Sequence, residues 1–122
     1  MFDHLGFAVA DFSASRAFYV AALAPLGITA AMEFGDRAGF GRDGQPRFWI
    51  GGGGKPPGHF HLAFAAHNRE AVRAFHAAAL KAGARDNGQP GLRPDYHPNY
   101  YGAFVIDLNG HNIEAVRHSP EA

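Results

Sequence analysis

The sequence has no cysteine among its 122 residues, and its charges balance at eleven Lys plus Arg against eleven Asp plus Glu. The absence of cysteine excludes disulfide frameworks, thiolate metal sites and cysteine nucleophiles. A net charge of zero provides no attraction for a phosphate backbone, so we expect no nucleic-acid binding. No apolar run approaches the roughly 18 residues of a membrane span, and the first residues lack the pattern of a signal peptide. We therefore expect a cytoplasmic protein without a membrane partner.

Apolar and aromatic residues are plentiful by contrast. Hydrophobic residues make up 47% of the chain, with eleven Phe, four Tyr and one Trp. This is enough apolar area for a chain of this size to form one core without disulfides or a structural metal. Eight histidines are the other conspicuous feature.

An internal repeat organises the chain. The segment that begins at His4 aligns without gaps with the segment that begins at His61, and eleven of twenty positions are identical. Alanine inflates such a count, but His, Leu, Phe and Arg also recur in the same register. We interpret the chain as two copies of one structural unit.

Each copy is predicted to begin with a strand, at 2–9 and at 60–66, because these short runs are apolar or alternating. A helix follows in each copy, capped by Asp11 or Ser13 in the first and by Asn68 in the second. Gly27 and Gly83 are expected to end the helices. The inward faces are predicted to carry Phe18, Ala22 and Leu26 in the first helix, and Val72, Phe75, Ala79 and Leu80 in the second. Glycine and proline then favour short strands, at 29–34, 38–41 and 48–51 in copy one and at 84–87, 101–107 and 112–116 in copy two.

The predicted fold class is therefore α+β, with two βαβββ modules in a single domain of residues 1–122. Module one covers about 1–51 and module two about 59–118. The glycine- and proline-rich segment 52–58 lies between them and lacks the lysine-serine ending and following helix of a phosphate-binding loop. We interpret it as a connector.

Histidine occupies the same position of both repeated first strands. His4 and His61 can each be a structural histidine that is hydrogen-bonded to the backbone. Alternatively, a pseudo-twofold arrangement of the two modules brings equivalent residues together, so that both histidines converge on one point. Strict alternation in the last strand places Glu114 on the face opposite Ile113 and Ala115, where a glutamate taken alone is expected to face solvent. Beside two convergent histidines, Glu114 completes a set that binds a divalent first-row metal and leaves positions open for water and substrate.

Four segments carry a resemblance to a known family: DHLGFAV at 3–9, AFY at 17–19, HLAF at 61–64 and DLNGHNIE at 107–114. With the paired βαβββ units, they resemble the vicinal oxygen chelate superfamily, which includes glyoxalase I, bleomycin-resistance proteins, fosfomycin-resistance thiol transferases and extradiol dioxygenases. The resemblance covers nearly the whole chain. It implies a cup-shaped mixed sheet with a metal inside the cup, chelated by vicinal oxygens of a small-molecule substrate.

The resemblance also implies the ligands. His4 and His61 match the histidines of the first strand in each module, and Glu114 matches the carboxylate of the last strand. A glyoxalase-like site adds a fourth ligand from the last strand of module one, but the segment 47–51 contains no carboxylate. Trp49 in this segment either lines the cup, where it contributes to substrate binding, or packs in the core or a dimer interface. The cofactor is expected to be one divalent ion, and Fe, Mn, Ni, Co and Zn all remain open.

The irregular segment 88–99 leads into a strong predicted strand and offers further candidates. Arg93 is expected to contact an anion, His97 to act as general acid or base, and Tyr100 and Tyr101 to donate hydrogen bonds. The alternative is a proline-stiffened surface loop. Tyr19 and His76, at equivalent helix positions, are expected to be partly exposed, and His59, His67, His111 and His118 are given no role.

The preferred hypothesis is a metal-dependent lyase, isomerase or dioxygenase that acts on a small molecule. A protein that sequesters an aromatic drug or metabolite without turnover is the alternative, and a structural module whose histidines only pack is a third. Because two-module chains of this family commonly pair, we also expect a homodimer in which both chains can supply ligands.

Overall fold

The computed structural model describes residues 1–121 and contains two βαβββ units in sequence. Module one comprises β1 (Leu5–Ala8), α1 (Phe12–Leu23), the 3-10 turn η1 (Ala24–Leu26), β2 (Thr29–Phe34), β3 (Arg37–Gly41) and β4 (Phe48–Gly51). Module two comprises β5 (His61–Ala65), α2 (Arg69–Lys81), β6 (Arg85–Leu92), β7 (Tyr101–Ile106) and β8 (Asn112–Arg117). Within residues 1–121, no helix is long and apolar enough to cross a membrane.

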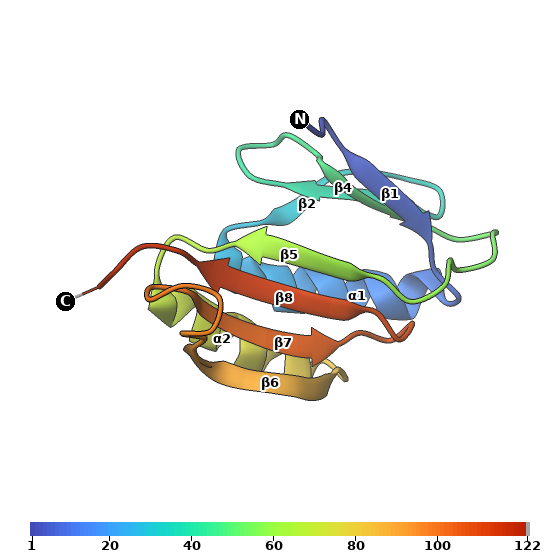
Figure 1. Cartoon of the computed structure of the whole chain (residues 1–122). Helices are drawn as coiled ribbons and strands as arrows, with labels where there is room; N and C mark the ends of the chain where they lie inside the picture. The colour runs from blue at the N-terminus through green and yellow to red at the C-terminus, as the bar shows by residue number, and fades with distance from the viewer. Residues whose placement is uncertain (122) are drawn as a thin grey trace.

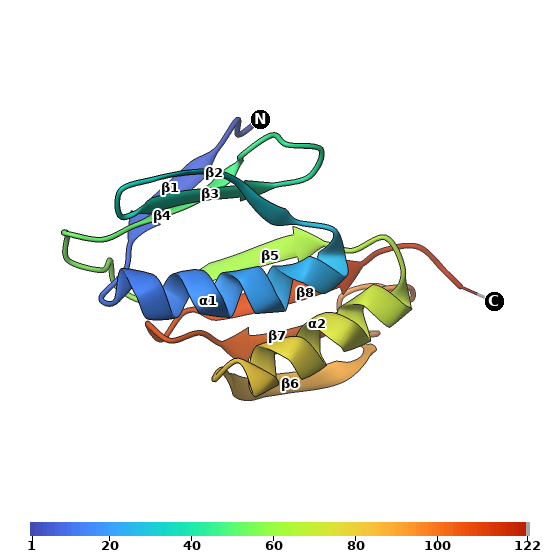
Figure 2. The same ribbon diagram turned by 180° about the vertical axis from the view of Figure 1, so that it is seen from behind.

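The strands form two four-stranded mixed sheets of the same topology, ordered β1-β4-β3-β2 and β5-β8-β7-β6. In each sheet the first strand runs parallel to the last strand of its module, and the remaining pairs are antiparallel. Figure 1 views the second sheet from the side that no helix covers, and Figure 2 shows both helices on its other side. The predicted fold class is confirmed. We call the face of each sheet that turns away from the helices its open face.

The helices begin where the sequence predicts. The Asp11 side chain accepts a hydrogen bond from the Ala14 amide, and the Asn68 side chain accepts one from the Ala71 amide. Each therefore satisfies one of the amides that a helix N-terminus leaves without a partner. The predicted inward residues are buried except Leu80, which is 36% exposed.

The expectation that Tyr19 and His76 are partly exposed is wrong, since both side chains are buried. Each finds a carboxylate: the Tyr19 hydroxyl donates to Asp107 at 2.5 Å, and His76 Nε2 lies 2.9 Å from Asp86 Oδ1. A polar group can be buried at low cost when it has such a partner. The partners lie 88 and 10 residues away in the sequence, so local helical periodicity does not identify them.

Several strand boundaries differ from the predictions by one to three residues, and β6 differs most. It extends to Leu92, whereas the sequence predicts a strand at 84–87 followed by an irregular segment. Its register against β7 shifts between Asp86 and Gly88 and again between Gly88 and Gly91. Such bulges at the edge of a sheet accommodate the glycines and Pro90, which weaken the prediction of a strand.

The two modules are joined by aromatic packing. Among the described residues, no strand of one sheet pairs with a strand of the other. Phe7 of β1 contacts Phe60 at a centroid distance of 4.9 Å and His111 at 5.4 Å, and Phe48 of β4 contacts Phe64 of β5 at 5.3 Å. These five rings form what we call the aromatic joint.

His111 is fully buried in the aromatic joint, stacked on Phe60 at a centroid distance of 3.9 Å. Its Nδ1 accepts a hydrogen bond from the Phe60 amide, and its Nε2 has no partner within residues 1–121. Burial lowers the pKa of His111, so the ring stays neutral. This histidine, to which the sequence assigns no role, therefore packs as an aromatic ring.

We predict that Tyr19→Phe lowers the free energy of unfolding by about 1–3 kcal/mol, because it removes a hydrogen bond to a buried carboxylate. Urea denaturation followed by circular dichroism measures the change. Tyr96→Phe is the matched control, since Tyr96 is exposed, and it should cost less than about 0.5 kcal/mol. Equal effects of the two substitutions would contradict a stabilising role for the Tyr19 hydroxyl.

We also predict that His111 makes the protein less stable at acidic pH. The unfolded chain takes up a proton at His111 near pH 6.5, whereas the folded chain, in which the pKa is lowered, does so only at lower pH. The free energy of unfolding therefore falls as the pH drops below about 6.5. Urea denaturation at pH 7.5 and 5.5 should show a smaller pH-dependent loss in His111→Phe than in the parent. An identical loss in both proteins contradicts this assignment.

Candidate functional site

The open face of the second sheet holds a histidine and a glutamate that contact each other. His61 begins β5 and Glu114 lies on the adjacent β8, where Ile113 and Ala115 point to the core. His61 Nε2 donates to Glu114 Oε1 at 2.9 Å. A glutamate taken alone at this position is expected to face solvent, but Glu114 is 1% exposed, whereas the His61 side chain is 48% exposed. The pair thus combines a shielded carboxylate with an imidazole that solvent can reach.

Tyr100 completes the surroundings of this carboxylate. It immediately precedes β7, and its hydroxyl donates to Glu114 Oε2. Burial and the neighbouring carboxylate raise the pKa of Tyr100, because both disfavour a phenolate. Each oxygen of Glu114 therefore has its own donor, which lowers the cost of burying the charge.

His4 lies in the other module, at the start of the first sheet. Its side chain is 62% exposed, and Nδ1 lies 2.8 Å from Oδ1 of its neighbour Asp3. It lines a pocket of about 870 Å³ on the open face of the first sheet, together with Trp49 and Phe34. Among residues 1–121, no group of three His, Cys, Asp or Glu side chains is close enough to hold one metal ion. A single chain therefore brings His61 and Glu114 together and leaves His4 apart.

Trp49 occupies the position in module one that Glu114 occupies in module two. Trp49 is the register partner of Gly6, and Glu114 is the register partner of Ala63, which aligns with Gly6 in the internal repeat. On the neighbouring strand β3, the register partner of Trp49 is Gly39, and the indole lies over it. A side chain would not fit there, because a Cβ atom at Gly39 would lie 2.7 Å from Trp49 Cε2. The ring is therefore seated on the open face of the first sheet, where it forms part of the pocket wall.

The predicted residues of the segment after β6 separate into three places. Arg93 lies on the open face of the second sheet, with its guanidinium carbon 5.4 Å from the centre of the Phe104 ring. His97 Nε2 lies 2.9 Å from Nδ1 of His118, and His97 makes no hydrogen bond to His61 or Glu114 in the described chain. The Tyr101 hydroxyl accepts a hydrogen bond from Arg73 of α2, on the helix side of the sheet. The structure thus groups Tyr100 and Arg93 with the His61–Glu114 pair and places Tyr101 elsewhere.

Phe104 is a site residue that sequence analysis missed. It is the register partner of Glu114, and its ring centre lies 6.1 Å from that of His61. Alternation within β7 predicts which residues share its face, but not which face that is. The pairing of β7 with β8 supplies this information, and no single-strand pattern contains it.

The geometry of the His61–Glu114 pair suits two ligands of one ion. Around an ion with bonds of about 2.1 Å, two ligand atoms at a right angle are about 3 Å apart. The observed separation is 2.9 Å. Imidazole nitrogen and carboxylate oxygen are both ligands of divalent first-row metals. The pair can therefore provide half of a metal site, to which other ligands must be added.

Comparison with solved structures finds close structural relatives. The chain is similar to a glyoxalase/bleomycin resistance protein from Albidiferax ferrireducens T118, with 32% sequence identity, a TM-score of 0.83, and coverage of 95% of this chain and 98% of that chain. It is also similar in fold to a glyoxalase/bleomycin resistance protein/dioxygenase family enzyme from Burkholderia phytofirmans PsJN, at 18% identity, 96% and 98% coverage and a TM-score of 0.72. A glyoxalase-related enzyme from Fulvimarina pelagi has 15% identity, 92% and 84% coverage and a TM-score of 0.69. No protein-family model and no curated protein matches the sequence.

We predict that Glu114→Gln lowers the pKa of Tyr100, because it removes the negative charge that opposes ionisation of the phenol. The remaining effect of burial should keep the value above that of free tyrosine. A pH titration by NMR of protein labelled at tyrosine Cζ measures the change, and Tyr100→Phe assigns the resonance. Glu33→Gln, which changes an exposed glutamate of β2, is the control and should leave the titration unaltered. If Tyr100 titrates identically in the parent and in Glu114→Gln, its hydroxyl does not lie against this carboxylate.

Proposed function

Because the chain belongs to the glyoxalase/bleomycin resistance protein family, we propose that it is a metal-dependent enzyme for a small molecule with vicinal oxygens. His61 and Glu114 hold one divalent ion together with His4 of a second copy of the chain. The observation that carries this proposal is the His61–Glu114 pair, with two suitable ligand atoms 2.9 Å apart on an open face.

The surroundings of the pair support the fit to a metal ion. The imidazole is half exposed, so an ion can approach from solvent, whereas the carboxylate is buried and fixed by two donors. A divalent ion would take the place of the proton on His61 Nε2, which would move to Nδ1 or to solvent, and the ion would neutralise the buried charge of Glu114. Tyr100 remains as the partner that orients the carboxylate, which is the usual task of a residue behind a metal ligand.

The third ligand is assigned to a second chain because of where His4 lies. His4 and Trp49 share the open face of the first sheet, whereas His61 and Glu114 share that of the second. In a homodimer, the first sheet of one chain can face the second sheet of its partner and complete the ligand set. Two such sites per dimer follow from twofold symmetry.

The residues of the chain divide the chemical tasks between them. A bound divalent ion acts as a Lewis acid that stabilises negative charge on a substrate oxygen. Glu114, His61 and His4 would hold the ion, and Trp49 would provide an apolar wall at the position that corresponds to Glu114 in module one. The Tyr100 hydroxyl keeps its proton and donates a hydrogen bond to Glu114 Oε2. An isomerase or lyase would also need a proton acceptor, and a dioxygenase would need iron and a place for oxygen.

A second candidate function is sequestration of an aromatic molecule without turnover. The observation that favours it is the pocket of about 870 Å³ on the first sheet, where the rings of Trp49 and Phe34 lie 6.0 Å apart. Aromatic walls suit flat ligands. The structural relative from Albidiferax ferrireducens T118 is described as a glyoxalase/bleomycin resistance protein, and binding between aromatic walls requires no metal. Binding of an aromatic ligand that is unchanged by a chelator would support it.

We predict that protein purified without a histidine tag and dialysed against a single metal retains about one divalent ion per chain. His61→Ala and Glu114→Ala should reduce the ion content at least tenfold, because each removes a ligand. His67→Ala is the control, since His67 is exposed and lies beyond the end of β5. Elemental analysis measures the content. A parent that stays empty with iron, manganese, nickel, cobalt and zinc contradicts the metal site and leaves sequestration.

Complementation tests whether the site is shared. A mixed dimer of one His4→Ala chain and one Glu114→Ala chain contains one intact site if ligands come from both chains, and none if they come from one chain. Differently tagged chains can be co-expressed and the mixed dimer isolated. We expect about one ion per mixed dimer, against none in either variant alone. Absence of metal from the mixed dimer rules out the shared site.

A further inference from the structure

An arginine without an acidic partner lies on the open face of the second sheet. In the described chain, Arg93 makes no ion pair, and its guanidinium rests on the Phe104 ring at 5.4 Å. The residue is partly buried. A cation that is partly shielded from water and lacks a counter-ion attracts anions more strongly than a fully solvated one.

Two backbone carbonyls hold the guanidinium in place. Nη1 donates to the Gly91 carbonyl at 2.9 Å, and Nη2 donates to the Gln89 carbonyl at 2.7 Å. Because a guanidinium has five N–H groups, three remain for a ligand. The carbonyls and the phenyl ring fix the plane of the group, so that little side-chain entropy is lost when an anion binds.

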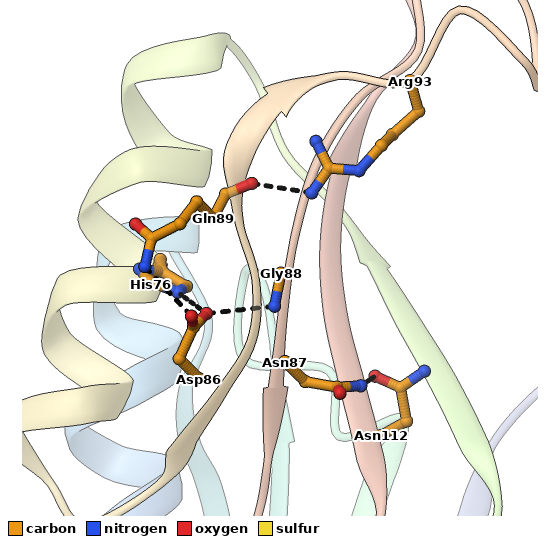
Figure 3. Close-up of polar contacts among 7 residues, drawn as sticks. All are labelled: His76, Asp86, Asn87, Gly88, Gln89, Arg93 and Asn112. Atoms are coloured by element: carbon orange, nitrogen blue, oxygen red, sulfur yellow. Dashed lines mark hydrogen bonds and ion pairs between the residues drawn. The ribbon is translucent and has the colours of Figure 1, made fainter.

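The strand that supplies these carbonyls is anchored to α2. Figure 3 shows the Asp86 carboxylate turned toward the helix, where it receives hydrogen bonds from His76, Gln89 and the Gly88 amide. The register of β6 shifts on both sides of Gly88, and the preceding Asn87 donates a hydrogen bond to the Asn112 side chain of β8. Gly88 is required at this point because a Cβ atom would lie 2.9 Å from Phe104 and 3.2 Å from Arg93 Nη2. Asp86 therefore positions the arginine from the far side of the sheet.

Phe104 connects the arginine to the His61–Glu114 pair. It lies between them on the open face, since its ring centre is 6.1 Å from that of His61 and 5.4 Å from the Arg93 guanidinium carbon. These two distances place the Arg93 guanidinium carbon no more than about 11.5 Å from the centre of the His61 ring. A ring or short chain of about the size of benzene spans the interval when its ends make contact with both groups.

We propose that Arg93 binds a carboxylate or similar anion at the end of the substrate remote from its vicinal oxygens, with the body of the substrate lying over Phe104. This inference rests on the proposed function for the position of the vicinal oxygens, but the anion site itself does not. The substrate class is thus an anionic, planar or apolar molecule that chelates at one end and carries its charge at the other.

The anion site is tested first without metal. Benzoate and the neutral benzamide are titrated into metal-free protein labelled with nitrogen-15, and the side-chain Nε–H resonance of Arg93 is followed by NMR. We expect a saturable shift with benzoate and none with benzamide. Arg85→Gln, which removes the exposed arginine at the start of β6, should leave the benzoate response unchanged. If benzoate causes no saturable shift at Arg93, the inference is overturned, whatever metal the protein binds.

The spacing is tested with metal bound. Benzohydroxamate chelates through two neighbouring oxygens, and 4-carboxybenzohydroxamate adds an anion at the far end of the ring. Calorimetry with the nickel-loaded protein should show that the carboxylated probe binds about tenfold more tightly or better, as expected for a charge-assisted pair. Arg93→Gln should abolish this preference and leave the affinity for benzohydroxamate unchanged, and Arg93→Lys should retain part of it. Equal affinities for both probes in the parent overturn the predicted spacing.

The positioning role of Asp86 has its own readout. Asp86→Asn weakens the anchor of β6, so the preference for the carboxylated probe should fall several-fold while benzohydroxamate binds as before. If only the stability of the protein changes and the preference is kept, Asp86 does not position Arg93. A protein that takes up none of the five ions overturns the metal site, and the benzoate titration then still decides the anion site.

Discussion

The packing of aromatic rings between the two modules is the interaction on which the rest of the structure depends. Within the described residues the sheets share no strand pairing, so side chains alone set how one module lies against the other. Phe7 contacts Phe60 and the neutral ring of His111, and Phe48 contacts Phe64. Each aromatic pair is worth about 0.5–1.5 kcal/mol beyond its buried area. The Tyr19–Asp107 hydrogen bond adds a polar link whose direction is fixed. Because apolar contacts tolerate little displacement in a close-packed interior, this joint holds the two open faces in a fixed relation.

Much of the fold is predictable because local sequence and the repeat agree. Asp11 and Asn68 cap helices as expected, and the strands at 29–34 and 48–51 form with the predicted bounds. The same repeat indicated His61, and alternation in β8 put Glu114 on the face that His61 shares. The cap and strand predictions succeed because they depend on periodicity within one element or on equivalence between copies, whereas the metal-binding roles of His61 and Glu114 stay predictions.

The remaining features depend on contacts between distant segments. The partners of Tyr19 and His76, the shifted register of β6 and the place of Phe104 all follow from how strands and helices are paired. Pairing has no signature within a single strand, and a shift of one residue exchanges the two faces. The distance between His4 and His61 likewise depends on how the aromatic joint orients the two modules, and the internal repeat does not predict it. Equivalent residues of two modules come together only if the modules face each other, and within one chain these sheets do not bring their histidines together.

The exchange of a carboxylate for Trp49 removes the chemical symmetry of the two halves. Two faithful copies of one unit would surround a bound molecule with the same groups from both sides, and the molecule could enter either way round. Here one side presents an indole seated over Gly39, and the other presents Glu114 under Tyr100. In the site proposed between two chains, a molecule would have only one orientation in which its apolar side meets the indole. The pseudosymmetric scaffold thereby acquires two chemically unlike sides, and with them one preferred direction in which a ligand with a single apolar side can lie.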